Sequence, residues 1–165
     1  MTEAKDILVI GLGNPDCGDD GLGPLVARKL GEGDCAGARV IARSGDALGL
    51  IEDWADSETV LLVDAAAAIS RPGSIHRIDL ATEGLPRDLS LSSTHAFSMA
   101  DAVGLARTLD MLPPHIIVYA VEGISFAPGA PMSVEVVAAA DEVACRVMRE
   151  LHCLSEVEPC TKPAS

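Results

Sequence analysis

The sequence predicts an α/β domain, a three-layer α/β/α sandwich with a mostly parallel sheet of about five strands. Strand-like and helix-like segments alternate along the chain, and the strand-like segments at residues 7–10, 59–63 and 116–121 are almost entirely apolar. A strand that is apolar on both faces is typical of a parallel sheet covered by helices on each side. The length of 165 residues suits one domain with one core.

The first half of the chain predicts two βα units. The aliphatic strand at residues 7–10 is followed by a glycine-rich loop, after which apolar residues recur at helical spacing. These residues are Leu22, Leu25, Val26 and Leu30. Pro24 is tolerated in a first helical turn, and Gly31 is suited to end the helix. Residues 39–42 then form a short second strand, and Asp46 is placed to cap a helix that ends near Trp54.

The second half continues the alternation with less regular segments. Residues 59–63 predict a buried third strand, whereas residues 74–80 predict a weaker one that is antiparallel or at an edge. Three further elements are expected, a helix at residues 98–109, a strand at 116–121 and a final helix at 133–151. Residues 1–154 therefore form a single domain, and the polar, proline-containing residues 155–165 are expected to be a flexible tail.

Composition excludes several classes of partner. Twelve basic and 25 acidic side chains give a net charge of −13, which repels nucleic acid and anionic membranes over a screening length of about 8 Å. The chain holds only four Phe, Trp and Tyr side chains on which bases could stack. An apolar run long enough to span a membrane and a secretory signal are both missing, so we expect a cytoplasmic protein with no nucleic-acid or membrane partner.

The five cysteines predict neither a disulfide framework nor a zinc knuckle. Their number is odd, and no two of them form a CxxC pair. Reduced thiols are the simplest interpretation.

Three chemically informative side chains follow predicted strands. Ligands collect outside the carboxyl ends of the strands in such sheets, and Asp20, Asp64 and His95 are expected at that edge. Two carboxylates within roughly 4 Å repel by about 4 kcal/mol at an effective dielectric of 20, so such a pair takes up a proton or a cation. Two carboxylates with one imidazole leave coordination positions open, and imidazole favours nickel or zinc over calcium or magnesium.

The loop sequence GLGNPDCGDDGLG, residues 11–23, has three functional interpretations. A dinucleotide fingerprint requires a third glycine where Asp16 stands, and three aspartates in this loop oppose a pyrophosphate. The opening GLGNP is also similar to that of bacterial peptidyl-tRNA hydrolase, but acid follows where that family has a basic, histidine-containing stretch. The third interpretation rests on a resemblance that extends far beyond this loop.

Residues 7–30 resemble the opening of the nickel-iron hydrogenase maturation endopeptidases, with the strand, the GxGN turn, the GDDGxGP segment and the following helix of that family. The resemblance continues in TVLLVDA at residues 59–65 and in STH at residues 93–95. In its order of segments it covers residues 7–151. It implies an endopeptidase that removes a C-terminal extension from a hydrogenase large-subunit precursor after nickel insertion.

The resemblance also implies roles for particular residues. The family's metal-contacting positions fall on Asp20, Asp64 and His95, which we expect to be both the catalytic residues and the metal ligands. Many members carry Glu at the first position, so the shorter Asp20 changes the reach into the cleft. The metal is nickel carried by the substrate, and no tightly bound cofactor is expected, although zinc or cadmium can occupy such a site in vitro.

The expected substrate-binding residues are Asn14, Gly45 and Asp46. Asp46 also has the simpler interpretation of a helix cap, and Asn14 that of shaping its loop. Asp19 is expected to be a solvated or loop-bracing acid, and Cys17 to pack as a small hydrophobe rather than bind metal. His76 is expected to be structural or exposed. The rival functions are a nickel-binding or chaperone-like maturation factor that does not cut, and peptidyl-tRNA hydrolase.

Overall fold

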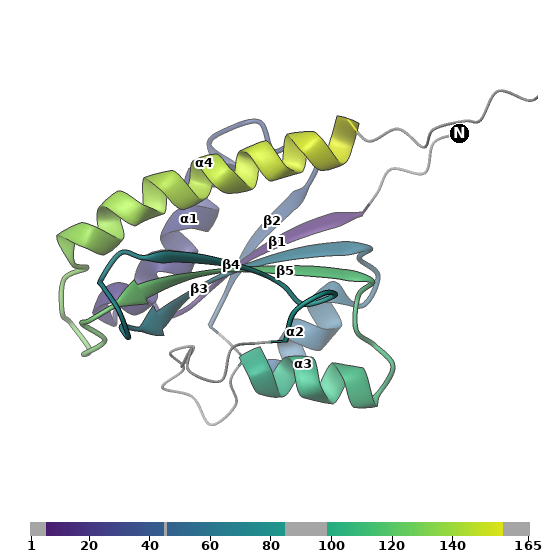
Figure 1. The fold of residues 1–165 in the computed structure, drawn as a ribbon, viewed down its shortest axis with the longest axis horizontal. Helices are drawn as coiled ribbons and strands as arrows, with labels where there is room; N and C mark the ends of the chain where they lie inside the picture. The colour runs from purple at the N-terminus through teal and green to yellow at the C-terminus, as the bar shows by residue number, and fades with distance from the viewer. Residues whose placement is uncertain (1–5, 45, 85–98, 157–165) are drawn as a thin grey trace, which may run out of the picture.

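The computed structural model describes residues 6–44, 46–84 and 99–156, which form one α/β unit (Figure 1). The strands in these residues are β1 (Ile7–Leu12), β2 (Arg39–Arg43), β3 (Thr59–Ala67), β4 (Ile75–Asp79) and β5 (His115–Gly123). The helices are α1 (Leu22–Gly31), α2 (Ala47–Trp54), α3 (Met99–Thr108) and α4 (Val134–Glu156), and a 3-10 turn, η1 (Gly18–Gly21), precedes α1. The predicted fold class is confirmed.

The five strands of the described residues form one sheet in the order β2-β1-β3-β5-β4. All neighbouring strands are parallel except β4, which pairs antiparallel with β5 at the edge. This confirms the prediction that residues 74–80 hold an edge or antiparallel strand. The exposed and half-buried side chains of β4 fit that position.

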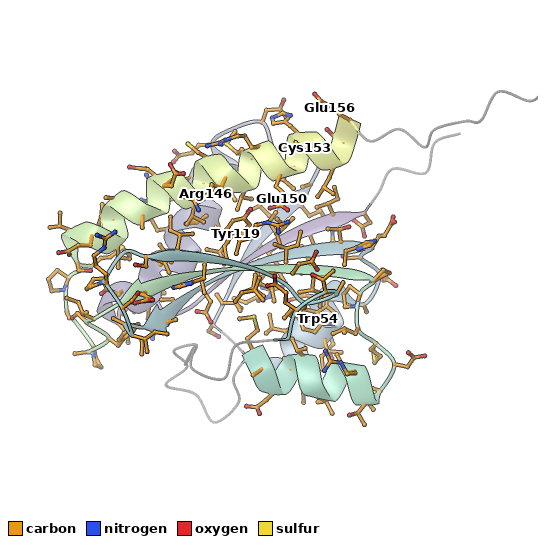
Figure 2. All side chains as sticks on the ribbon, viewed as in Figure 1. Trp54, Tyr119, Arg146, Glu150, Cys153 and Glu156 are labelled. Atoms are coloured by element: carbon orange, nitrogen blue, oxygen red, sulfur yellow. The ribbon has the colours of Figure 1, made fainter. Side chains whose placement is uncertain are left out.

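Helices cover both faces of the sheet (Figure 1). On one face α1 and α4 bury aliphatic side chains of both helices against Val9, Leu61 and Val121. On the other face α2 and α3 pack against Ile10, Leu62 and Val118, and Trp54 fills this layer (Figure 2). The core of the described residues is therefore almost entirely aliphatic.

Close contact between β1 and α1 sets the position of the loop that joins them. A Cβ added to Gly11 would lie 2.1 Å from the carbonyl oxygen of Gly23, and one added to Gly23 would lie 2.1 Å from that of Leu12. Backbone therefore meets backbone here, and neither neighbour has a flexible side chain that can move aside.

We expect Gly23→Ala to lower the free energy of unfolding by about 1 to 3 kcal/mol or more, because overpacking at this contact forces the backbone apart. Gly31→Ala is the matched control in the same helix, because nothing lies within 4 Å of the added Cβ. That variant should be neutral or gain up to about 1 kcal/mol. Urea unfolding of the two variants measures the difference, and equal stabilities would contradict the packing described here.

Most element boundaries differ from the predictions by one or two residues, and two differences are described here. β3 does not end before Asp64 but continues to Ala67, because β5 pairs with it as far as Gly123. Asp64 therefore lies within a strand. α4 continues to Glu156, two residues beyond the predicted domain boundary at residue 154. None of the helices in the described ranges is long and apolar enough to cross a lipid bilayer.

Candidate active site

The candidate site lies at the carboxyl edge of the sheet, toward which β1, β3 and β5 all run (Figure 1). The loop after β1 contains η1, which carries Asp20 and contacts both α1 and β3. Gly11 near the end of β1 is in register with Val63 of β3, the residue before Asp64. The parallel register thus brings the loop after β1 to the part of β3 that carries Asp64.

Asp64 is a buried carboxyl, with a side chain that is 5% exposed. Its Oδ1 accepts a hydrogen bond of 2.8 Å from the backbone N–H of Ala65. Burial raises the pKa of Asp64 well above its ordinary value, the negative charge of Asp20 raises it further, and the Ala65 N–H acts in the opposite direction. The charge of Asp20 therefore acts on the carboxyl of Asp64.

Asp20 is also buried, at 2% exposure, and is held by the turn that follows β1. Its Oδ2 accepts a hydrogen bond of 2.9 Å from the N–H of Asn14. Gly13 has a φ of 136°, and a Cβ there would lie 1.9 Å from the Asp20 carbonyl oxygen. The side chain of Asn14 accepts from the N–H of Asp16, so it shapes the loop while its backbone orients Asp20.

His95 and Gly45, two of the predicted site residues, lie outside the described residues. Met99 begins α3 four residues after His95 and packs in the same core as Leu62 and Ala66, which share a face of β3 with Asp64. In residues 6–44, 46–84 and 99–156, no group of three or more His, Cys, Asp and Glu side chains could hold a metal ion. Cys17 is buried there as a free thiol. The described part of the site is the pair of carboxylates.

Asp46 caps α2, which confirms the simpler of its two interpretations. Its Oδ1 accepts a hydrogen bond of 3.2 Å from the N–H of Leu48, and its backbone is extended. Asp46 also lines a cleft of about 300 Å³, together with Arg43, Ser44, Gly49, Glu52 and Asp53. Arg43 and Asp53 form an ion pair of 2.6 Å within it. A helix cap can therefore also line a surface open to a substrate.

Asp19 is fully buried and joins three segments of the chain. Its Oδ2 accepts from the N–H groups of Ile124 and Ser125 at 2.9 and 3.0 Å, and its Oδ1 accepts from the N–H of Ser133 at 2.7 Å. Burial acts to raise the pKa of Asp19, but these hydrogen bonds outweigh it and leave the pKa below its ordinary value. The expectation of a loop-bracing acid is confirmed, and that of a solvated one is wrong.

Glu122, a residue that the sequence analysis did not single out, holds the loop after β3 by accepting hydrogen bonds from its backbone. It is fully buried, and its Oε2 accepts from the N–H groups of Ile69, Ser70 and Arg71 at 2.9 to 3.0 Å. Its Oε1 lies 2.8 Å from Nε2 of His76, which is therefore structural. The only indication of this role in the sequence is a single acidic residue near the end of an otherwise apolar strand, β5.

The two buried acids adjoin each other through Gly123, since a Cβ there would lie 2.7 Å from Cβ of Asp19. Together they fix the loops that leave β3 and β5 on either side of the candidate site. The two carboxylates accept hydrogen bonds from backbone N–H groups of these loops and also from the hydroxyls of Ser70 and Ser133. Asp19 directly precedes Asp20, so these hydrogen bonds hold the turn that carries Asp20.

Glu122 predicts an acid-dependent loss of stability. Burial acts to raise its pKa, but hydrogen bonds from Ser70, His76 and Ile69 outweigh it and lower the pKa from 4.5 to about 2. A folded-state pKa below the unfolded one stabilises the fold above about pH 4.5, and this contribution is lost as the pH falls toward 2. The difference corresponds to roughly 3 kcal/mol.

Urea unfolding of wild type and Glu122→Gln at pH 6, 4 and 3 measures this contribution. Wild type should be the more stable at pH 6, and the gap between the two proteins should shrink as the pH falls. A gap that stays constant from pH 6 to 3 would contradict the assignment of an ionised Glu122 in the folded protein.

The fold is shared with solved structures of maturation proteases. It is similar to the NiFe hydrogenase maturation protease HycI from Thermococcus kodakarensis KOD1, with a TM-score of 0.71, 19% identity, and coverage of 92% of this chain and 95% of that one. It is also similar to the hydrogenase maturating endopeptidase HybD from E. coli, with a TM-score of 0.70 and 20% identity. That match covers 90% of this chain and 93% of that one. The solution structure of an endopeptidase from Escherichia coli has a TM-score of 0.72 and 21% identity. That match covers 93% of this chain and 95% of that one.

The family follows from the sequence itself. The family model of the hydrogenase maturation protease HycI matches residues 40–150, more than half of the 165-residue chain. No curated protein sequence matches the chain significantly. The family match, with this fold, identifies the protein as a peptidase. It belongs to the hydrogenase maturation protease family, which confirms the resemblance drawn from its motifs and sets aside peptidyl-tRNA hydrolase.

Proposed function

We propose that the protein removes the C-terminal extension of a nickel-iron hydrogenase large-subunit precursor after nickel insertion, and that it recognises the nickel carried by that substrate. The observation that carries this proposal is the pair of buried carboxylates, Asp20 and Asp64, at the carboxyl edge of the sheet. The negative charge of Asp20 disfavours ionisation of Asp64, and a cation presented by a substrate relieves that repulsion. His95 supplies the third, neutral ligand.

In this mechanism the three side chains contact the nickel of the precursor and leave coordination positions for the precursor's own ligands. The contact places the scissile peptide bond beside Asp20, which the N–H of Asn14 orients. Asp20 acts as the general base that takes a proton from a water molecule as it attacks the peptide carbonyl, and it returns this proton to the leaving amine as the C–N bond breaks. Burial and the charge of Asp20 keep the pKa of Asp64 raised in the free protein, and the nickel of the precursor favours the ionised form of this carboxyl.

Substrate recognition involves Asn14, Gly45 and Asp46. The cleft beside the cap of α2 supports this role for Asp46, because the same residue ends the loop after β2 and faces open space. We propose no tightly bound cofactor, and expect zinc or cadmium to occupy the ligand set only in vitro. The proposed location is the cytoplasm, where the free thiols of Cys17, Cys35, Cys145 and Cys153 remain reduced.

Mass spectrometry of a nickel-loaded precursor after incubation with the protein tests the activity. Wild type should shorten the precursor at its C-terminus, and Asp20→Ala should lose activity by roughly 10²- to 10⁴-fold, the usual contribution of a general base. Asp16→Ala, in the same loop but exposed, is the control and should process normally. A precursor that binds wild type and keeps its full mass would instead favour the non-cleaving nickel-binding or chaperone-like factor.

A further inference from the structure

Two large apolar residues are exposed on neighbouring segments of backbone where β3 and β5 end. Ile69, in the loop after β3, is 60% exposed, and Ile124, directly after β5, is 59% exposed. The N–H of Ala68 donates to the carbonyl oxygen of Gly123 at 3.0 Å, so each isoleucine directly follows a residue of this backbone pairing. We call Ile69 and Ile124 the isoleucine pair.

One contact places the isoleucine pair on the same face of the sheet as Asp64. Oε2 of Glu122 accepts a hydrogen bond of 3.0 Å from the N–H of Ile69. Glu122 is in register with Ala66, two residues after Asp64, so the side chains of Glu122 and Asp64 lie on one face of the sheet. The loop that carries Ile69 is therefore held at the edge and on the face that carry Asp64.

A second, independent contact ties the isoleucine pair to the turn that carries Asp20. Oδ2 of Asp19 accepts a hydrogen bond of 2.9 Å from the N–H of Ile124, and Asp19 directly precedes Asp20. With standard backbone dimensions, this contact keeps the Cα atoms of Ile124 and Asp20 within about 12 Å of each other. Both members of the pair thus adjoin the candidate active site.

A protein substrate cannot reach Asp20 and Asp64 without approaching the isoleucine pair. A standard protein interface buries about 800 Å² on each partner, which is a patch roughly 25 to 30 Å across. Such a patch centred on the two carboxylates includes Ile124 and the adjoining loop. Exposed apolar side chains gain free energy when an apolar partner surface covers them.

The backbone of the isoleucine pair is already fixed in the free protein. Asp19 and Glu122, the carboxylates that accept from the two N–H groups, are both 0% exposed. A segment that is ordered before binding loses little conformational entropy when a partner covers it. This arrangement is suited to docking of a partner.

We propose that the isoleucine pair is a docking surface for the hydrogenase large-subunit precursor. An apolar patch of the precursor covers Ile69 and Ile124 while its metal is at Asp20 and Asp64. The pair contributes affinity and does not touch the reacting atoms. This inference rests on the proposed function and adds a binding surface to it.

Replacement of the two apolar side chains tests the proposal. The double variant Ile69→Ser/Ile124→Ser should raise the Kd and the KM of the nickel-loaded precursor by roughly ten- to a hundredfold, with kcat nearly unchanged. The double variant Ile69→Leu/Ile124→Leu keeps the apolar area and should stay within about threefold of wild type. Leu109→Ser is the control, because Leu109 is 53% exposed between α3 and β5, at the opposite edge of the sheet.

Equal Kd values for the serine double variant and Leu109→Ser would overturn the proposal. An effect confined to self-association in size-exclusion chromatography would also overturn it, because the occupant would then be a second copy of this chain. Urea unfolding should give the serine double variant the wild-type midpoint, and a raised Kd that accompanies a lowered midpoint would count against the pair. If wild type binds the precursor without cutting it, the proposed function fails, while the Kd values still decide the role of the isoleucine pair.

Discussion

Asp64→Asn is expected to slow processing of the precursor strongly and, at the same time, to stabilise the free enzyme above neutral pH. The buried Asp64 carboxyl has a raised pKa because of desolvation and the charge of Asp20. A folded-state pKa above the unfolded one contributes stability below about pH 3.9, and that contribution is lost as the pH rises through the folded-state value. Asparagine keeps an oxygen for the N–H of Ala65 and never ionises.

The stability difference between Asp64→Asn and wild type should therefore be small near pH 4 and grow in favour of the variant toward pH 8. Each 1 kcal/mol regained shifts the melting temperature by roughly 2 to 4 °C in a protein of this size. Thermal unfolding at the two pH values measures it, and precursor cleavage should fall by about 10²-fold or more. A variant that is less stable than wild type at pH 8, or that still cuts at the wild-type rate, would contradict this account of Asp64.

Asp19→Asn is expected to have the opposite effect on stability, with a loss of about 3 to 5 kcal/mol. The Asp19 carboxylate accepts hydrogen bonds from Ile124, Ser125 and Ser133. An asparagine amide turns one of these acceptors into a donor that faces other donors in a fully buried position. The loop after β5 and the start of α4 then lose their common anchor, and processing falls with them.

Asp16→Asn is the matched control for this effect, since its side chain is exposed in the same loop. Urea unfolding at pH 7 should separate the two variants by at least about 3 kcal/mol. If both variants unfold at the same urea concentration, Asp19 is not the anchor that its contacts describe.

The fold could be predicted in large part because its determinants are local. Apolar runs gave β1, β3 and β5, and a cap residue followed by an apolar stripe gave α2. The end of β3 could not be predicted, because Ala65, Ala66 and Ala67 join the strand only through pairing with the end of β5. Pairing of this kind depends on residues more than 50 positions away.

The same distinction holds for the candidate site. The proximity of Asp20 and Asp64 could be predicted because parallel strands end at one edge, whatever the details of packing. The partners of Asp19 lie 105 to 114 residues away in the chain, and Glu122 binds a loop more than 50 residues before it. Buried acids of this kind resemble surface acids in a sequence, because only the tertiary structure supplies the N–H groups they accept from.

The most direct measurement of the central claim is the cleavage rate of one precursor with and without nickel, followed by mass spectrometry, for wild type and His95→Ala. We predict that wild type shortens only the nickel-loaded precursor, and that His95→Ala shortens neither form at a comparable rate. Equal cleavage of the nickel-free precursor by wild type would contradict the claim that Asp20, Asp64 and His95 meet on the substrate's metal.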